Sequence, residues 1–477
     1  MDKTTLSPFG GGKKSNATCT ILIGVAIAVL VCGAVVFALG ALLFYRPQIL
    51  SLGPTATPTK TPQAGAVSSP ATDAPTPNPT DTPLPPTGPP PPADTPVPEP
   101  PTAEPPSADT PEPPTATPPP RPSKPLRMSS PEYGMQAFLW WRPETAHRDL
   151  GLVRDAGFTW VKQTFSWREI EGSAKGSFGW ERPDRIVAQV EEFGLDLVAR
   201  IDSQPAWAGG SFPENGPPDD LQDLADFLYA MASRYKGRIR AYQVYNEPNL
   251  NVAGRSEWGG RPPNPAEYTE LLRVAYQAIK QADPNAMVIS AGLAPTSRWD
   301  DQAMPDEEFL RGMYAAGAKP YFDVLGVHGA GYKVPPETDP AVVARDPVLN
   351  NNDPSPEERK RIYCFRHVED LRQIMVENGD GDKQIALLEF GWASDPRPDS
   401  PYYWHFVTEE EKGDYLVRAY QYAKQNWAPW IGMMSLIYVA DPDWTENSEQ
   451  YWWAITYPDY PEMKWRPAYV AVKNMPK

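Results

Sequence analysis

Two short stretches decide the fold of this chain: IRAYQVYNEPN at residues 239–249 and QIALLEFGW at residues 384–392. Each is a mostly apolar run that ends near a glutamate, Glu247 in the first and Glu389 in the second. Short apolar runs bounded by turn residues are typical of strands buried within a parallel sheet. The carboxyl ends of such strands meet at one side of the sheet, so the two glutamates are expected on the same side.

Six further runs have the same character, and stretches with helical periodicity separate them. The predicted strands are residues 133–140, 159–164, 196–201, 239–245, 287–291, 324–328, 384–390 and 432–439. The clearest predicted helices are residues 183–193, 220–235, 265–282, 357–377 and 409–425. Eight strand–helix units predict an α/β fold, a (β/α)8 TIM barrel, over residues 129–477. A doubly wound open sheet would need a glycine-rich phosphate turn after an early strand, and the sequence has none there.

The N-terminal part has a different composition. Residues 19–45, CTILIGVAIAVLVCGAVVFALGALLFY, contain no charged side chain. As a helix they would cover roughly 40 Å, enough to cross a hydrocarbon core of about 30 Å. We expect a transmembrane signal-anchor, because cleaved signal peptides usually have apolar regions of only about 7–15 residues. Cleavage near the small residues 38–41 is the alternative.

Lysines precede this segment, so the positive-inside rule predicts a cytoplasmic tail at residues 1–18 and an extracellular barrel. The chain would then be a single-pass protein of the cell membrane. Residues 46–128 hold 29 of the 60 prolines, a density that prevents helix and sheet from propagating. This Pro/Thr-rich segment predicts a disordered linker, with an O-glycosylated stalk or a ligand for aromatic grooves as alternatives.

Charge and cysteine usage exclude several classes. The chain has 44 basic and 60 acidic residues, a net charge of −16 without a basic block, which argues against nucleic-acid binding. Two of the three cysteines fall in the apolar segment, so Cys364 has no partner and is expected to be inert packing. With only four histidines, no metal site and no cofactor are expected. We expect a monomer.

Two carboxylates on one side of a barrel point to glycoside hydrolysis. That reaction needs one group to protonate the leaving oxygen and another to act at the anomeric carbon. Taken alone, Glu389 would be interpreted as a solvated strand end and Glu247 as part of a turn. Their joint placement on the fourth and seventh strands favours the catalytic one.

The Asn246-Glu247-Pro248 triplet on strand four and Glu389 on strand seven resemble glycoside hydrolase clan A. The nearest resemblance is to retaining hydrolases of families 5 and 39, relatives of cellulases, mannanases and β-xylosidases. The resemblance implies that Glu247 is the acid/base, Glu389 the nucleophile and Asn246 a donor to the sugar 2-hydroxyl. His328, at the end of strand six, falls where the clan often has a site histidine.

Some positions depart from the clan pattern. Many clan members have an arginine on strand two, where this chain has Lys162 or Gln163. Aromatic side chains at or after strand ends are candidates for substrate binding, since sugar faces stack on such rings. These candidates are Tyr332, Trp167, Trp207, Tyr438 and Trp444. Of the tryptophans at or beyond strand ends, Trp167, Trp207, Trp392 and Trp444, about half are expected to fill the gap between barrel and helices instead.

The sequence therefore predicts a membrane-tethered, extracellular hydrolase that cleaves O-glycosidic bonds of a β-linked glycan with retention of configuration. Two alternatives remain open. The first is a catalytically silent barrel that binds carbohydrate for adhesion or sensing, which would not need both glutamates. The second is a metal-dependent barrel hydrolase, which would need clustered His and Asp ligands at strand ends.

Overall fold

The computed structural model describes residues 125–210, 212–252, 255–462 and 464–477. The predicted cytoplasmic tail, the predicted transmembrane segment and nearly all of the predicted linker lie outside these residues. Within the described ranges, no helix combines the length and the apolar character that a membrane crossing requires.

Eight parallel strands form a closed barrel in the order β1-β10-β9-β8-β7-β4-β3-β2. Each predicted strand overlaps one of them, so the (β/α)8 prediction is confirmed. The barrel strands are β1 (Glu132–Gln136), β2 (Trp160–Ser166), β3 (Asp196–Asp202), β4 (Ala241–Val244), β7 (Met287–Ile289), β8 (Val324–Ala330), β9 (Gln384–Gly391) and β10 (Ile431–Leu436). A short hairpin of β5 (Asn251–Val252) and β6 (Arg255–Ser256) follows β4.

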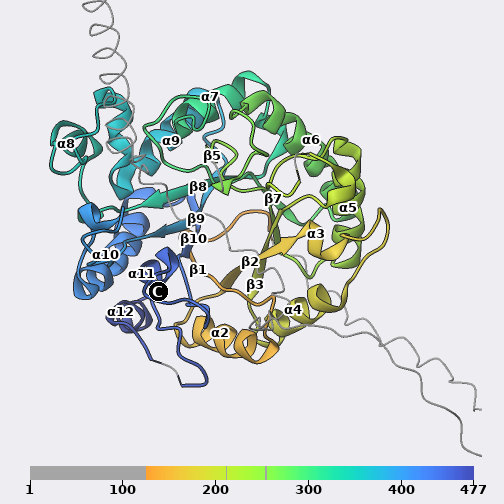
Figure 1. Ribbon diagram of the computed structural model, residues 1–477, viewed down its shortest axis with the longest axis horizontal. Coiled ribbons are helices and arrows are strands. Elements are labelled where there is room, and N and C mark those ends of the chain that lie inside the picture. The colour runs from red at the N-terminus through yellow and green to blue at the C-terminus, as the bar shows by residue number, and fades with distance from the viewer. Residues whose placement is uncertain (1–124, 211, 253–254, 463) are drawn as a thin grey trace, which may run out of the picture. The chain divides into compact units, whose positions relative to one another are not determined.

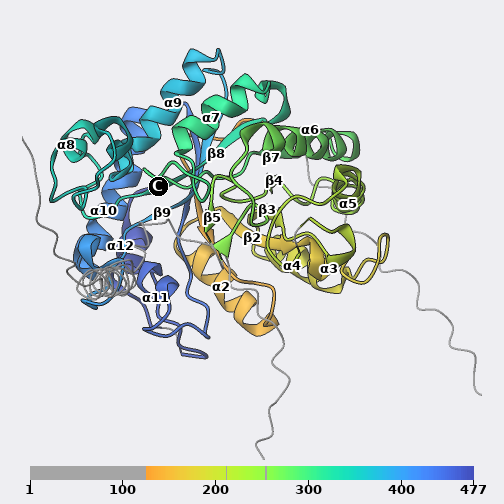
Figure 2. The same cartoon turned by 45° about the horizontal axis from the view of Figure 1, so that its top comes forward.

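Helices follow every barrel strand and surround the barrel as a ring (Figure 1). They are α2 (Pro143–Asp155), α3 (Trp167–Ile170), α4 (Glu181–Glu192), α5 (Leu221–Arg234), α6 (Pro265–Ala282), α7 (Asp306–Ala315), α8 (Pro340–Arg345), α9 (Val368–Glu377), α10 (Glu409–Tyr422), α11 (Glu449–Trp453) and α12 (Pro467–Asn474). Figure 2 shows α7 and α9 as neighbours in this ring.

Helix starts follow local capping chemistry. Asn264 accepts hydrogen bonds from the first free amides of α6, and Pro265 occupies the first helical position. Thr408 and Glu411 form a capping box at the start of α10. Both helices begin where the sequence predicted, because the signal lies within four consecutive residues.

An apolar layer fills the barrel interior near the amino ends of the strands. It contains Met128, Trp160, Val198, Ala241, Met287, Ile289, Val324, Ala386, Leu388 and Met433. Side chains alternate along a strand, so residues two positions further on face the same interior. On β2, β3 and β4 these residues are Lys162, Arg200 and Gln243, all buried. The interior thus changes from apolar to polar toward the carboxyl ends of the strands.

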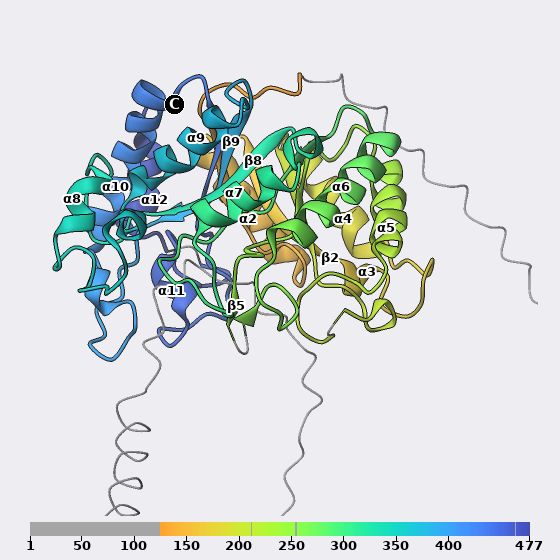
Figure 3. The same ribbon diagram turned by 90° about the horizontal axis from the view of Figure 1, so that it is seen from above.

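Figure 3 shows the two sides of the barrel: the orange start of the described chain lies opposite to β5. Because β5 follows β4, its side is the one on which the strands end. The loops that carry the predicted site residues therefore lie away from the residues that connect to the N-terminal region.

The segment predicted as one helix over residues 357–377 is interrupted. Residues Glu357–Ile362 and Phe365–His367 form 3-10 turns, and only α9 is α-helical. Cys364 between them is extended, which sends Tyr363 toward Tyr332 and Phe365 toward Trp427. Cys364 is buried as expected, and burial raises the pKa of its thiol to about 12, so it stays protonated. Its predicted mid-helix position was wrong, because two aromatic clusters on opposite sides require an extended residue.

Candidate functional site

The end of β4 presents Asn246 and Glu247 on a strained backbone. Glu247 has φ 39°, and Tyr245 has φ 63°, both in the left-handed region that non-glycine residues rarely adopt. The Glu247 amide donates to the carbonyl of Gly292, 3.0 Å away, after β7. Asn249 donates to the carbonyls of Ala294 and Met304 and accepts from the Ala294 amide. The Asn-Glu-Pro-Asn segment is therefore fixed by the loop after β7.

His328 of β8 lies between the two predicted catalytic glutamates. Its Nδ1 is 2.8 Å from Oε1 of Glu247, and its Nε2 is 4.0 Å from Oε1 of Glu389. The register of β8 and β9 pairs His328 with Glu389 directly. A side chain at Gly292 would come within 2.2 Å of His328 Nε2, so glycine is required beneath the ring. The structure thus brings Glu247, His328 and Glu389 together as the sequence predicted.

Two cations complete this group, and neither was among the predicted site residues. Lys162 of β2 donates to Oε1 of Glu389 at 2.7 Å, and both side chains are buried. Arg200 of β3 lies 4.0 Å from the same oxygen and pairs with Asp202 at 2.5 Å. We call Lys162, Arg200, Glu247, His328 and Glu389 the carboxylate cluster. Lys162 reaches Glu389 from the neighbourhood in which clan members often have an arginine.

The cluster shifts the pKa values of its two glutamates in opposite directions. Burial raises the pKa of Glu247 well above its usual value, and the negative charge of Glu389 raises it further. Burial also opposes ionisation of Glu389, but Lys162 and Arg200 outweigh it and hold its pKa below the usual value. Burial lowers the pKa of His328 to about 3, so its ring is neutral. One protonated and one ionised carboxyl group at the same imidazole is the arrangement that an acid and a nucleophile require.

Several buried polar atoms at this site have no hydrogen-bond partner among the described residues. They are Asn246 Nδ2, Glu247 Oε2, Glu257 Oε1, His328 Nε2 and Glu389 Oε2. Such groups are rare in folded proteins, and a bound polar ligand is one way to satisfy them. Asn246 is fixed through its side-chain oxygen, which accepts from Gln243 at 3.2 Å. Its free amide can therefore donate to a ligand.

Tyr438 and Trp444 form an aromatic wall near the carboxylate cluster. Tyr438 lies two residues beyond β10 rather than within the strand, which corrects its predicted position. Burial raises its pKa well above the usual value, and the charges of Glu389 and Glu247 contribute to that shift. Both rings pack on Phe138, with centroids 5.5 Å and 4.9 Å away. Phe138 was not predicted, although it follows β1 as the other candidates follow their strands.

The remaining aromatic candidates lie in other surroundings. Tyr332 is buried against Tyr363, Trp404 and His405. Trp167 is fully buried and stacks on Phe227 of α5, so it fills the layer between barrel and helices. Trp207 packs edge-on against Trp167 and donates to the Glu171 carbonyl. Trp167 and Trp207 therefore pack against each other in the layer between barrel and helices.

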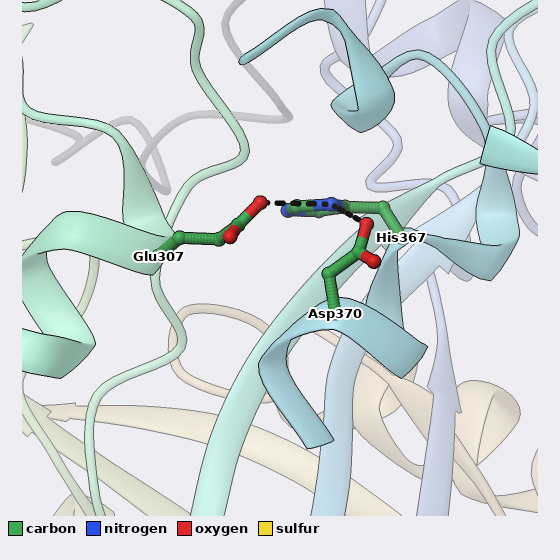
Figure 4. Close-up of side chains that lie close together, drawn as sticks. All are labelled: Glu307, His367 and Asp370. Carbon is green, nitrogen blue, oxygen red and sulfur yellow. Dashed lines mark hydrogen bonds and ion pairs between the residues drawn. The ribbon is translucent and has the colours of Figure 1, made fainter. Parts of the chain in front are cut away.

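Two further histidines, His367 and His405, are buried. His405 packs between aromatic rings, and His367 connects α7 to the start of α9. His367, Glu307 and Asp370 have ligand atoms within 4.8 Å of one another, the spacing of a metal site (Figure 4).

The contacts of this group favour an ion-pair cluster over a metal centre. His367 Nε2 lies 2.8 Å from Asp306, and Arg361 donates twice to Asp370. Burial lowers the pKa of His367, but Asp306 and Asp370 outweigh it and raise the pKa well above the usual value. A protonated imidazole has no lone pair for a metal.

Comparison with known proteins was consistent with these features. Residues 124–320 match the model of the cellulase family, glycosyl hydrolase family 5. This range includes Glu247 but not Glu389. No curated protein sequence matches the chain.

Solved structures share the barrel fold. A family 39 glycoside hydrolase from the gut symbiont Bacteroides cellulosilyticus WH2 is 18% identical, with TM-score 0.53, over 74% of this chain. The match spans 63% of that protein's length. GH5_18 from Streptomyces cattleya, in complex with GlcNAc, is 14% identical, with TM-score 0.51, over 72% of this chain and 79% of its own. The predicted resemblance to clan A glycoside hydrolases is thereby confirmed, in the family 5 cellulase pattern of residues 124–320 and in a barrel shared with family 39 and family 5 proteins.

Proposed function

We propose that the chain is a retaining glycoside hydrolase that cleaves O-glycosidic bonds of a β-linked glycan. The observation that carries this proposal is the opposite pKa shift of Glu247 and Glu389 on the two sides of His328. A pair of titratable groups that their surroundings drive apart defines an acid and a nucleophile. Lys162 provides the cause, because it contacts Glu389 directly.

The chemistry follows from this pair. Glu247 donates its proton to the glycosidic oxygen while ionised Glu389 attacks the anomeric carbon, forming a glycosyl ester and releasing the leaving group. Esterification removes the negative charge of Glu389, which is one of the causes that raise the pKa of Glu247. Glu247 then ionises more readily and accepts a proton from the water that hydrolyses the ester. Two inversions restore the β configuration.

Neighbouring residues position the sugar. The free amide of Asn246 is placed to donate to a hydroxyl group, and the aromatic wall of Tyr438, Trp444 and Phe138 offers faces and edges for packing. His328 contributes as a neutral ring that holds Glu247 in place. The silent carbohydrate binder has no observation in its favour, because binding alone does not require the two pKa values to diverge.

Substitution of each glutamate tests the roles. We expect Glu389→Ala to lose turnover on all substrates, because no glycosyl ester forms. We expect Glu247→Ala to lose about 10²–10⁴-fold on a 4-nitrophenyl glycoside but far less on a 2,4-dinitrophenyl glycoside, whose leaving group needs no proton. Equal losses of Glu247→Ala on both leaving groups would refute the acid/base assignment. Glycan binding by the wild-type protein without any hydrolysis would favour the silent binder.

Stereochemistry tests the retaining mechanism independently. Proton NMR of the anomeric signals in the first minutes should show a β product from a β-linked substrate. An initial α product would indicate inversion, in which water rather than Glu389 attacks the anomeric carbon. A first panel can include β-mannosyl-1,4-GlcNAc, since a variant of the Streptomyces cattleya protein was solved with Manb1-4GlcNAc.

We also propose that the enzyme is tethered at the outer face of the cell membrane. The support is the uncharged segment at residues 19–45, the lysines before it and the Pro/Thr-rich residues 46–128. Such a tether would hold a secreted activity at the cell while letting it reach an extended substrate.

A further inference from the structure

Glu257 is a third buried glutamate beside the carboxylate cluster. It follows the β5–β6 hairpin and is 1% exposed. The next residue, Trp258, is fully buried between Tyr245 and Tyr268. The amide of Glu257 donates to the carbonyl of Leu250 at 3.3 Å. These contacts fix the carboxyl group of Glu257 in one place.

Only one oxygen of this carboxyl group has partners. Oε2 accepts from Asn215 Nδ2 at 2.7 Å and lies 3.7 Å from the guanidinium of Arg200. Oε1 is buried and has no hydrogen-bond partner among the described residues. Burial raises the pKa of Glu257 to about 7, and Arg200 opposes that shift.

Glu257 is electrostatically part of the site. Its charge is one of the causes that raise the pKa of Glu247, and Glu389 in turn raises the pKa of Glu257. It shares Arg200 with Glu389. Asn246, Glu247, His328 and Glu389 also have buried polar atoms without hydrogen-bond partners among the described residues. Such a group of buried polar atoms with unused hydrogen-bonding capacity is suited to the hydroxyl groups of a sugar ring.

We propose that Oε1 of Glu257 accepts a hydrogen bond from a hydroxyl group of the sugar whose anomeric carbon Glu389 attacks. Glu257 would then be a third functional glutamate, whose role is to determine which sugars the site accepts. This inference rests on the proposed function and deepens it. It explains why a buried carboxylate oxygen is left without a partner, which is costly unless a ligand satisfies it.

The competing interpretation is that Glu257 only neutralises Arg200. Asp202 already contacts Arg200 more closely, at 2.5 Å against 3.7 Å for Glu257. Carboxylates away from the site differ in how they use their oxygens: Asp149 and Glu409 each leave one buried oxygen without a hydrogen-bond partner among the described residues. Both oxygens of the buried Glu171 accept hydrogen bonds, from the Trp167 indole and from the Gly176 amide. Glu171 therefore provides a matched control.

The substitution Glu257→Gln separates the two interpretations. The glutamine oxygen can keep the bond from Asn215, which places the NH₂ group, a donor, at the position of Oε1. The full-length protein and the variant are assayed on 4-nitrophenyl β-D-glucoside, β-D-mannoside, β-D-xyloside and β-D-N-acetylglucosaminide. Monodeoxy analogues of the glycoside that the wild-type protein cleaves fastest are then compared, and thermal unfolding without ligand is measured for both proteins.

We expect Glu257→Gln to lower kcat/KM about 10- to 100-fold on the parent glycoside, the effect of losing one hydrogen bond to a charged group. The loss should disappear on the one deoxy analogue that lacks the bound hydroxyl group. The melting temperature should change little, because the bond from Asn215 is kept and Asp202 still pairs with Arg200 at 2.5 Å. Glu171→Gln should instead lower the melting temperature and leave kcat/KM within about twofold.

Three results would overturn the inference. An unchanged kcat/KM would show that Glu257 does not contact the sugar. An equal loss on all analogues together with a lower melting temperature would assign Glu257 a structural role. If the wild-type protein cleaves none of the glycosides or glycans, the proposed function fails, and this inference fails with it.

Discussion

Substitution of Lys162 by Met tests the electrostatic basis of the proposed mechanism. The Lys162 ammonium donates to Glu389 at 2.7 Å, and the two side chains are 1% and 2% exposed. Methionine keeps most of the side-chain volume but removes the cation. The effect of burial, which raises the pKa of Glu389, is then opposed less strongly. The pKa of Glu389 must therefore rise. Because the nucleophile has to be ionised, the acidic limb of kcat/KM should move to higher pH.

The same substitution should destabilise the fold. Removing one partner of a buried ion pair costs about 3–5 kcal/mol, since the other charge is left uncompensated. Arg200 remains 4.0 Å from Oε1 of Glu389, so the loss of stability should lie near the lower end of this range. For a barrel of this size about 2 °C per kcal/mol is expected, which corresponds to a melting temperature roughly 5–10 °C lower at neutral pH. Protonation of Glu389 in the variant relieves part of this cost, so the loss should shrink as the pH falls.

Calorimetry and pH–rate profiles provide the measurements, and Lys175→Met is the matched control. Lys175 also pairs with two carboxylates, Asp223 and Asp226, but it is 47% exposed. Exposed pairs contribute little, so neither the acidic limb nor the melting temperature should move appreciably. An acidic limb of Lys162→Met that stays in place, or moves to lower pH, would refute the assignment of Glu389 as the group that Lys162 keeps ionised.

Three further predictions concern other parts of the chain. Gly292→Ala should displace the His328 ring and lower kcat/KM by at least about tenfold, measured on the same glycosides, because a Cβ would come within 2.2 Å of Nε2. His367→Gln should destabilise the fold most below about pH 6.5, the usual pKa of histidine in an unfolded chain. The folded protein raises the pKa of His367, so the protonated ring stabilises the fold fully below the unfolded-state pKa. This stabilisation is lost as the pH rises through the folded-state pKa. Urea unfolding at pH 6 and pH 9 would show the difference, and a larger loss at pH 9 would contradict the ion-pair interpretation. Protease treatment of intact cells should release an active fragment that begins within residues 51–128, whereas protection until lysis would contradict the extracellular location.

The sequence predicted the barrel well because each strand is a local apolar run between turn residues. All eight strands were found within a few residues, and the errors fall at strand ends, as at β10, where Tyr438 lies beyond the strand. The predicted helix at residues 357–377 failed for a nonlocal reason. Its helical periodicity is real within α9, but aromatic partners from distant segments hold Tyr363 and Phe365 on opposite sides of an extended Cys364.

The two catalytic candidates were visible because Glu247 follows β4 and Glu389 lies near the carboxyl end of β9, whereas their partners lie within strands. Lys162 and Arg200 stand in the middle of β2 and β3, where a charged residue in an apolar run resembles a solvent-facing position. A signal did exist: each lies two positions after a residue of the interior apolar layer, Trp160 and Val198. Strand alternation then places the charge inside the barrel. To use this alternation, one must know which face of each strand points into the barrel, and the sequence alone did not show which face that is.

The division of roles between the glutamates also depends on these hidden partners. Glu247 and Glu389 are chemically identical and almost equally buried, so desolvation raises the pKa of both. What separates them is the ammonium of Lys162 on β2, which contacts Glu389 directly. Once Glu389 is ionised, its own charge raises the pKa of Glu247 further. In the proposed mechanism, the contact of one buried cation with Glu389 alone therefore determines which carboxyl group attacks and which one donates the proton.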